Sequence, residues 1–317
     1  MTIAAPPFLD AAAVDRALPM PRAIALMRDA FRALSQGDAT VPLRHGLPLA
    51  EADARLLVMP SRLAGARVAC VKVVSVVPAN ASRGRPTIQG VLMAIDAVTG
   101  TPLALLDAER VTALRTGAAS ALATQLVGAD GATTLALFGC GVQGAAQLEA
   151  IACVAPLSRV LVFARDPSRV RAFCDAWSTR LGVVVEPGDR ARGDLRAAEI
   201  VCTATTSGEP LFEADELHPF AHVNAVGSYT PAGCELPPAL MAEARVIVDQ
   251  RAACLAEAGE FAQARAAGRW TPAHVVEELG ELVGRVPAAR TGRSVFKSVG
   301  NAVQDLVCVE AIVDARA

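Results

Sequence analysis

The stretch Phe138-Gly139-Cys140-Gly141-Val142-Gln143-Gly144 decides the fold of this chain. It begins at the end of the apolar run TLALF (134–138) and leads into residues with helical spacing, so a Gly-x-Gly-x-x-Gly pattern stands between a strand and a helix. In this context the first glycine permits a tight turn, the second lets a phosphate approach the backbone, and the third lets the helix pack on the strand. The free N–H groups at the start of the helix favour an anion.

This motif predicts a dinucleotide site; the alternative is a glycine-rich turn without a ligand. The residues expected around the pyrophosphate are Gly139, Gly141, Val142, Gln143 and Gly144.

Strands and helices alternate on both sides of the motif. The predicted strands are TLALF (134–138), RVLVFA (159–164), VVVE (183–186), EIVCTA (199–204), HVNAVG (222–227) and RVIVD (245–249). Strands that alternate with crossover helices form a parallel, doubly wound sheet. The fold class is therefore α/β, with a Rossmann sheet as the dinucleotide-binding domain.

The N-terminal part of the chain has a different pattern. A helix is predicted over 10–35 with Asp10 as its cap, then short apolar strands with a hairpin around Thr99-Gly100, then an alanine-rich helix over 112–127 with Thr112 as its cap. The C-terminal stretch 296–315 is predicted to be helical and to return to this domain.

These patterns predict two domains. Residues 1–125 with 295–317 form an α+β domain for substrate binding and dimerisation, and residues 126–294 form the Rossmann domain.

Composition excludes several classes of protein. The 317 residues are 53% hydrophobic with a net charge of −2 and 4% aromatic residues, which gives no basis for nucleic-acid or membrane partners. The N-terminus lacks the pattern of a signal peptide and no run is long enough to span a membrane, so a cytoplasmic location is expected. The eight cysteines contain no Cys-x-x-Cys pair, and His218 and His222 lack a third ligand nearby, so no metal site is predicted.

The end of the second Rossmann strand bears on the choice of cofactor. An acid normally stands there when the ribose hydroxyls of NAD are bound, but this chain has Ala164, followed by Arg165 and Arg169. A missing carboxylate and an added cation suit a 2′-phosphate, so NADP(H) is the preferred cofactor and NAD(H) the second possibility. The alternative is that both arginines are ordinary surface residues.

Three basic residues of the first domain lie in apolar surroundings. Only two of the 30 basic residues are lysines, Lys72 and Lys297, which marks both as positions where arginine does not substitute. Lys72 stands in an apolar strand, so it pairs with an anion or loses its proton easily, unless its ammonium reaches water at an edge. Arg115 is placed in the first turn of the alanine-rich helix, where a cation needs an anion, and Arg44 lies in a turn between apolar stretches.

The chain resembles the ornithine cyclodeaminase/μ-crystallin family over most of its length. The segments that carry the resemblance are Val41–Arg44, Leu57–Pro60, Val71–Val74, Gln89-Gly90, Ala113–Ala119, Gly139–Gln143, Val226–Ser228 and Phe296–Gly300. The resemblance implies a homodimer joined through the first domain, with a small-molecule substrate between the two domains of one subunit.

The resemblance also implies roles for individual residues. Arg44, Lys72 and Arg115 would meet the substrate carboxylate, with Lys72 and Arg115 as the catalytic residues. The other residues that it places at the substrate are Met59 and Tyr229. The other residues that it places at the cofactor are Thr87, Thr116, Thr203, Thr205, Val226, Ser228 and Ser298.

Two positions depart from the cyclodeaminases of the family. Those enzymes carry a glutamate and an aspartate where this chain has Leu57 and Tyr229. Ornithine has a second ammonium that needs an anion and a base, whereas a cyclic ketimine has one ring nitrogen and a carboxylate. The sequence Gly-Ser-Tyr-Thr-Pro at 227–231 instead resembles the corresponding segment of the bacterial Δ1-pyrroline-2-carboxylate and Δ1-piperideine-2-carboxylate reductases.

The resemblance therefore predicts NAD(P)H-dependent reduction of such a ketimine to L-proline or L-pipecolate. Three alternatives remain open: a cyclodeaminating lyase with tightly bound NAD, another imino- or amino-acid dehydrogenase, and an NADPH-binding crystallin-like protein without turnover.

Overall fold

The computed structural model describes residues 5–50, 53–271, 273–274, 276–287 and 290–315, and the predicted domain ends at 1–4 and 316–317 lie outside these ranges. The chain divides into two compact units. Unit 1 contains residues 1–115 and 301–317, and unit 2 contains residues 116–300. Both boundaries differ from the predicted ones: the first falls within a helix and the second after a strand that the sequence did not reveal.

Unit 1 is built on a seven-stranded sheet in the order β1-β7-β6-β5-β4-β2, with β3 also paired to β4. Its strands are β1 (Phe8–Leu9), β2 (Ala39–Thr40), β3 (His45–Pro48), β4 (Arg55–Leu63), β5 (Val68–Val76), β6 (Ile88–Asp96) and β7 (Pro102–Asp107). The strand pairs from β2 to β7 are antiparallel, and β1 joins β7 in parallel. The hairpin predicted around Thr99-Gly100 is confirmed, and Gly100 has a φ of 72°, which suits glycine in the turn.

The helical pattern predicted over 10–35 is two helices, α1 (Ala11–Ala17) and α2 (Met20–Gln36). The prediction of one helix was wrong because Pro19 between them is extended and has no N–H to continue a helical ladder. Asp10 caps α1 as predicted.

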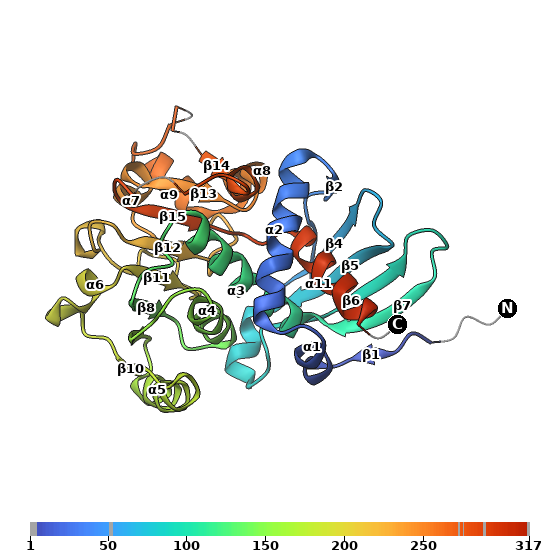
Figure 1. Ribbon diagram of the computed structural model, residues 1–317, viewed down its shortest axis with the longest axis horizontal. Coiled ribbons are helices and arrows are strands. Elements are labelled where there is room, and N and C mark those ends of the chain that lie inside the picture. Colours follow the sequence, from blue (N-terminus) through green and yellow to red (C-terminus); the bar gives the residue numbers. More distant parts are fainter. Residues whose placement is uncertain (1–4, 51–52, 272, 275, 288–289, 316–317) are drawn as a thin grey trace. The chain divides into compact units, whose positions relative to one another are not determined.

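Helix α11 (Ala302–Asp314) lies across β4, β5 and β6 and beside α2 (Figure 1). It is almost wholly buried, so it covers the inner face of the sheet. Alternation along β5 places Val68, Cys70, Lys72 and Val74 on this buried face, while the residues between them are only half-buried.

Helix α3 (Ala108–Leu126) begins four residues before the predicted start. Asp107, rather than Thr112, accepts the hydrogen bond of the first turn, from the backbone N–H of Arg110 at 2.7 Å. Arg115 is therefore in the middle of the helix, and the prediction that it lies in the first turn was wrong. The boundary between the units falls directly after it.

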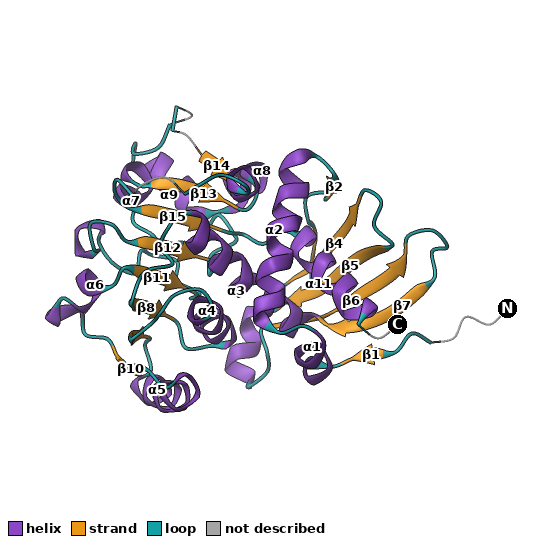
Figure 2. Ribbon diagram, viewed as in Figure 1, coloured by secondary structure: helices purple, strands orange, loops and turns teal. Residues whose placement is uncertain are grey.

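Unit 2 is a doubly wound sheet whose eight strands, within the part of the unit that is described, all pair in parallel in the order β10-β9-β8-β11-β12-β15-β13-β14 (Figure 2). Its strands are β8 (Thr134–Phe138), β9 (Arg159–Phe163), β10 (Val184–Pro187), β11 (Ile200–Thr203), β12 (His222–Ala225), β13 (Arg245–Val248), β14 (Val276–Glu278) and β15 (Ser294–Lys297). The six predicted strands are confirmed to within two residues, and β14 and β15 were missed.

The helical segments of unit 2 are α4 (Val142–Ala152), α5 (Pro167–Leu181), η2 (Arg190–Arg192), α6 (Asp194–Ala197), η3 (Ala214–Glu216), α7 (Pro238–Glu243), α8 (Arg251–Glu257), α9 (Gly259–Ala266) and α10 (Leu279–Leu282), while unit 1 also has the short helix η1 (Pro78–Arg83). No helix within the described ranges is long and apolar enough to cross a bilayer.

Strand β15 corrects the prediction of one helix over 296–315. Val295 and Phe296 are fully buried where β15 inserts between β12 and β13, so tertiary pairing overrides local pattern. Gly300, with a φ of 83°, and the N-cap Asn301 then separate the strand from α11.

Candidate active site

The glycine turn of unit 2 has the predicted strand–turn–helix geometry. Gly139 has a φ of 104°, and a Cβ there would lie 2.5 Å from the carbonyl oxygen of Ala204. A Cβ on Gly144 would lie 1.9 Å from the carbonyl oxygen of Gly139. Both contacts are far shorter than real side chains allow, so these positions require glycine for the turn and for the packing of α4 on β8.

Gly141 serves a different purpose. It is exposed, its backbone is extended, and a Cβ there would meet open space. It is the N-cap of α4 and makes no side-chain cap, and Val142 at the first helical position is 52% exposed. The helix start thus presents N–H groups to an open cradle, which fits a pyrophosphate.

The second strand of the sheet is followed by Ala164, and the first acid after it is Asp166. Ala164, Arg165 and Arg169 are exposed after β9. The nearby Asp166 caps α5, and it accepts from Ser168 Oγ at 2.6 Å and from two backbone N–H groups. These hydrogen bonds, chiefly the one from Ser168, lower the pKa of Asp166. Its Oδ1 thus caps the start of the helix.

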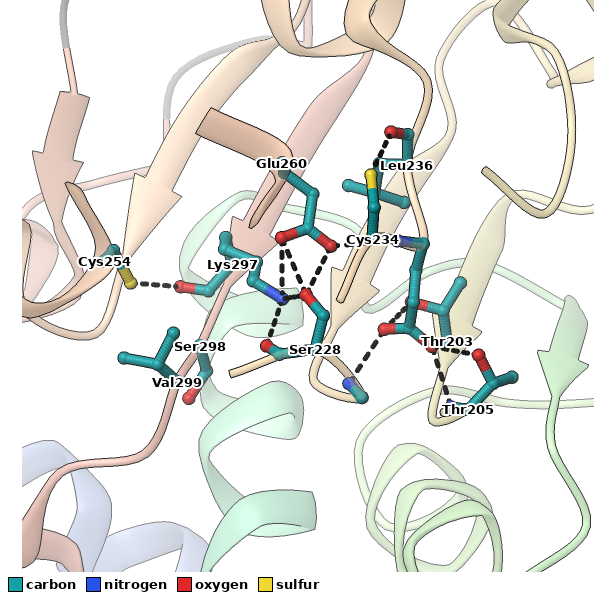
Figure 3. A network of polar contacts seen from close by, with 12 residues as sticks. Thr203, Thr205, Ser228, Cys234, Leu236, Cys254, Glu260, Lys297, Ser298 and Val299 are labelled. Atoms are coloured by element: carbon teal, nitrogen blue, oxygen red, sulfur yellow. Dashed lines mark hydrogen bonds and ion pairs between the residues drawn. The ribbon is translucent and has the colours of Figure 1, made fainter. Parts of the chain in front are cut away.

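The predicted cofactor residues at the ends of β11 and β12 point to buried acids that the sequence did not reveal (Figure 3). Thr203 donates to Glu235 Oε2 at 2.9 Å, and Thr205 donates to Glu235 Oε1 at 2.8 Å. Ser228 donates to the Glu260 carboxylate at 2.6 Å. The signal available in the sequence was two glutamates within apolar runs.

The second lysine of the chain lies in the same network. Lys297, at the end of β15, is completely buried, and its Nζ lies 3.2 Å from Glu260 Oε2 and 2.7 Å from the carbonyl oxygen of Ser228. On the neighbouring strand end, Asp249 accepts from Ser298 Oγ at 2.7 Å. The side chains of Thr203, Ser228 and Ser298 therefore serve first to fix the strand ends.

Three other predicted cofactor residues have different surroundings. Thr116 is buried in α3, where a Cβ on the adjacent Gly117 would lie 2.4 Å from the carbonyl oxygen of Ala146 in α4. Val226 is half-buried directly after β12, and its N–H donates to the carbonyl of Thr203 at 3.0 Å. Thr87 belongs to unit 1, where it is exposed before β6.

Of the residues described, no group of three His, Cys, Asp or Glu is placed to hold a metal ion. His222 is buried between Ser294 Oγ, 2.9 Å from Nδ1, and Asn224 Oδ1, 3.2 Å from Nε2. Burial lowers the pKa of His222 to about 3, so it is a neutral core residue.

The cationic cluster of unit 1 lies beneath α11. Lys72 in β5 is paired in register with Met59 in β4, and both are buried. The Nζ of Lys72 lies 2.7 Å from Oδ2 of Asp305, which α11 brings down onto the sheet. The same carboxylate accepts from Nε of Arg115 at 3.1 Å. Asp305 thus joins the two predicted catalytic residues.

Asp305 was missed in the sequence, although the polar pair Gln304-Asp305 stands in the apolar first half of the helix. Gln304 completes the arrangement, because its Oε1 accepts from Nη1 of Arg115 at 3.0 Å and from the N–H of Asn301 at 2.8 Å. The counter-charge of Arg115 is therefore a side chain 190 residues away, rather than an anion at a helix start.

The surroundings of Lys72 determine its proton affinity. Burial lowers the pKa of Lys72 to about 8, Asp305 opposes this shift, and the charges of Arg115 and Arg44 add to it. Arg44 is thus close enough for its charge to influence the pKa of Lys72. A lysine that titrates near neutral pH can release a proton during turnover.

Two positions depart from the cyclodeaminase pattern: Leu57, which is apolar and buried, and Tyr229, which is partly buried. Leu57 is 8% exposed and lies on the same face of β4 as Met59. Tyr229 belongs to unit 2, where it packs against the hydrophobic core of that unit. In the cluster around Lys72, the described residues thus include the carboxylate of Asp305, while Leu57 is apolar.

Residues 5–317 match the ornithine cyclodeaminase/mu-crystallin family. A Δ1-pyrroline-2-carboxylate reductase of Bacillus cereus is 34% identical over 292 residues, which cover 91% of this chain and 90% of the relative. The L-lysine cyclodeaminase of Streptomyces rapamycinicus is 32% identical over 308 residues, 94% of this chain and 87% of the relative.

A solved structure, the Thermococcus litoralis Δ1-pyrroline-2-carboxylate reductase in complex with NADH and L-proline, matches with a TM-score of 0.92 at 29% identity, covering 97% of this chain and 96% of that one. With the family match and the glycine turn, these likenesses lead to one conclusion: the chain belongs to the ornithine cyclodeaminase/mu-crystallin family.

Proposed function

We propose that this chain reduces a cyclic ketimine, Δ1-pyrroline-2-carboxylate or Δ1-piperideine-2-carboxylate, to L-proline or L-pipecolate with NAD(P)H. Its reductase relatives make it an oxidoreductase that acts on carbon–nitrogen bonds. The observation that carries the choice of substrate is the cluster of Lys72, Arg115 and Asp305 beside an apolar Leu57. Such a cluster suits a substrate with one carboxylate and no second ammonium.

The residues of unit 1 have separate tasks in this reaction. Arg44 and Arg115 bind the carboxylate of the imine, since guanidinium groups pair well with carboxylates. The nicotinamide cofactor supplies the hydride that C2 of the ring accepts. Lys72 supplies a proton to the ring nitrogen, so the C=N bond becomes an amine, and Asp305 stabilises the charged lysine beforehand.

NADP(H) is the proposed cofactor, with NAD(H) as the second choice. The support is the exposed pair Arg165 and Arg169 after β9, where Ala164 replaces the usual acid. Asp166, two residues further along the chain, uses its Oδ1 to cap the start of α5.

A cyclodeaminating lyase is the second candidate, because an L-lysine cyclodeaminase is among the relatives. That reaction needs a neutral side-chain amine to close the ring. An alkylammonium with a pKa near about 10.4 stays protonated at neutral pH without a base, and facing Leu57 it would be costly to desolvate. This argument favours the reductase.

The proposed assembly is a homodimer formed through the outer face of the unit 1 sheet. Half-buried apolar residues face outward there in two cross-strand rows. The rows are Val58-Val73-Val91 and Val71-Met93-Leu105. A contiguous apolar face of this kind suits a second copy of the chain.

One substrate panel tests the function. NAD(P)H oxidation is measured with both cyclic imines and with keto acids plus ammonia, and ammonia release is measured with L-ornithine and L-lysine. Rapid oxidation with a cyclic imine and no ammonia release from the diamines is expected. Ammonia and cyclic product formed at a rate that rivals imine reduction would favour the lyase.

A further inference from the structure

The carboxyl edge of the unit 2 sheet holds three buried carboxylates and one buried ammonium. Glu235 and Lys297 are completely buried, and Glu260 and Asp249 are 1% exposed. Lys297 pairs directly with Glu260. Among the described buried side chains of this edge, the acidic groups therefore outnumber the basic one.

Glu235 accepts four hydrogen bonds, an arrangement that suits an ionised carboxylate. Its Oε1 accepts from the N–H of Thr205 at 2.7 Å and from the hydroxyl of Thr205 at 2.8 Å. Its Oε2 accepts from the N–H of Gly227 at 2.8 Å and from the hydroxyl of Thr203 at 2.9 Å. Each oxygen thus faces a backbone N–H, which can only donate.

Burial raises the pKa of Glu235, and the charge of Lys297 and the hydrogen bonds from Thr205 and Thr203 oppose that shift. An amide in its place would fail in either orientation. Whichever way a glutamine turned, its NH₂ group would meet the N–H of Thr205 or of Gly227, donor against donor.

The acid ties together the strand ends that flank the second half of a dinucleotide site. The glycine turn follows β8, and the ribose-reading strand end of the first half belongs to β9. A dinucleotide crosses the point where the strand order reverses, so its second half lies over the ends of β11 and β12. Glu235 joins those two ends, because its carboxylate accepts hydrogen bonds from Thr203 and Thr205 after β11 and from the N–H of Gly227 after β12.

We propose that Glu235 is a positioning residue for the nicotinamide half of the cofactor, and that its ionised carboxylate makes the site favour the oxidised, positively charged ring. This inference rests on the proposed use of NAD(P)H. A nicotinamide ring gains positive charge as hydride leaves it, and a fixed negative group nearby stabilises that charge. The network of Glu260 and Lys297 holds the adjoining loop at Ser228.

The test compares Glu235→Gln with Glu209→Gln, which removes the same charge from an exposed position of the same unit. The dissociation constants of NADP⁺ and NADPH are measured by calorimetry without an imine, together with the melting temperature. Glu235→Gln should raise the Kd of NADPH about tenfold, the scale of losing charge-assisted hydrogen bonds. The rise in the Kd of NADP⁺ should be about three times as large as the rise for NADPH. The reason is that the lost buried charge also attracted the positively charged ring at a distance. Glu209→Gln should change neither constant.

A second variant keeps the charge and removes one donor. Thr203→Val should raise both constants together, about threefold, with their ratio unchanged, and it serves also if Glu235→Gln does not fold. Three outcomes would each overturn the inference. In Glu235→Gln, both constants could rise equally, or both could stay within about twofold of the wild type. In Thr203→Val, both cofactor forms could bind with wild-type constants. A wild-type chain that binds both cofactor forms but reduces no ketimine would contradict the proposed substrate instead.

Discussion

The two lysines of this chain are buried to nearly the same degree, yet their surroundings have opposite charge. Lys72 in unit 1 is 3% exposed and shares one carboxylate, Asp305, with Arg115. Lys297 in unit 2 is completely buried at an edge with three carboxylates, of which Glu260 is its direct partner. One region is short of negative charge and the other has an excess.

The proposed function and the proposal for Glu235 rest on this difference. An excess of cations that are already desolvated suits the carboxylate of a small acid. An excess of buried carboxylates suits a ring that becomes positively charged. Variants in unit 1 should therefore change turnover of the imine, and variants in unit 2 should change binding of the cofactor.

The largest effect is expected at Lys72. Lys72→Ala should lower kcat/KM for the imine by about 10²-fold or more, the usual scale for a proton-transfer group, with the Kd of NADPH unchanged. Lys72→Arg should not restore activity, because a guanidinium neither fits the space nor releases a proton. Steady-state kinetics and cofactor titration check this, and an active Lys72→Arg enzyme would leave the lysine only a charge role.

The next largest effect is expected at Arg165 in unit 2. Arg165→Ala should raise KM for NADPH about tenfold or more and leave KM for NADH and for the imine unchanged, since one charge-assisted contact is lost. Arg171→Ala, at an exposed position of helix α5, is the matched control. If both cofactors are unaffected, the arginine is an ordinary surface residue.

A smaller effect, on the pH profile, is expected at Asp305. The pKa of Lys72 is lowered to about 8, so the ammonium is present below that pH, and kcat/KM for imine reduction should fall as the pH rises through about 8. Asp305 acts to raise this pKa, so Asp305→Asn should move the alkaline limb to lower pH by about one unit. Glu310→Gln, on the same helix, should leave the limb in place. A limb that stays at the same pH in Asp305→Asn would separate Lys72 from the proton transfer.

The smallest effect on chemistry is expected on the outer face of the strand that carries Lys72. Val73→Glu places a charge in the apolar face and should convert a dimer to a monomer while the site on the inner face keeps its KM for the imine. Val98→Glu, in a turn where the side chain is 88% exposed, is the control. Light scattering after size exclusion measures the mass; a wild type of about 33 kDa would contradict the dimer at once.

Local pattern predicted the elements whose signal is local. The glycine turn, the six strands around it and the hairpin at Gly100 follow from short-range sterics and alternation. Strand β15 was missed because a short run of apolar residues fits a buried helix as well as a buried strand. The pairing of this segment with β12 and β13 is what makes it a strand. The helix over 10–35 failed at a single residue, Pro19, whose effect a spacing count overlooks.

The sequence by itself determined the family and the glycine turn, and it indicated that Lys72 is buried, because each depends on residue type at close spacing. The two lysines among 30 basic residues were predicted to be positions where arginine does not substitute, and both lie in buried charge clusters. Only the tertiary structure decided their partners, since Asp305 reaches Lys72 from the other end of the chain and Glu235 meets Thr203 across two strand ends. A buried charge needs an oppositely charged partner close in space, and that partner can lie anywhere along the chain, so local sequence does not identify it.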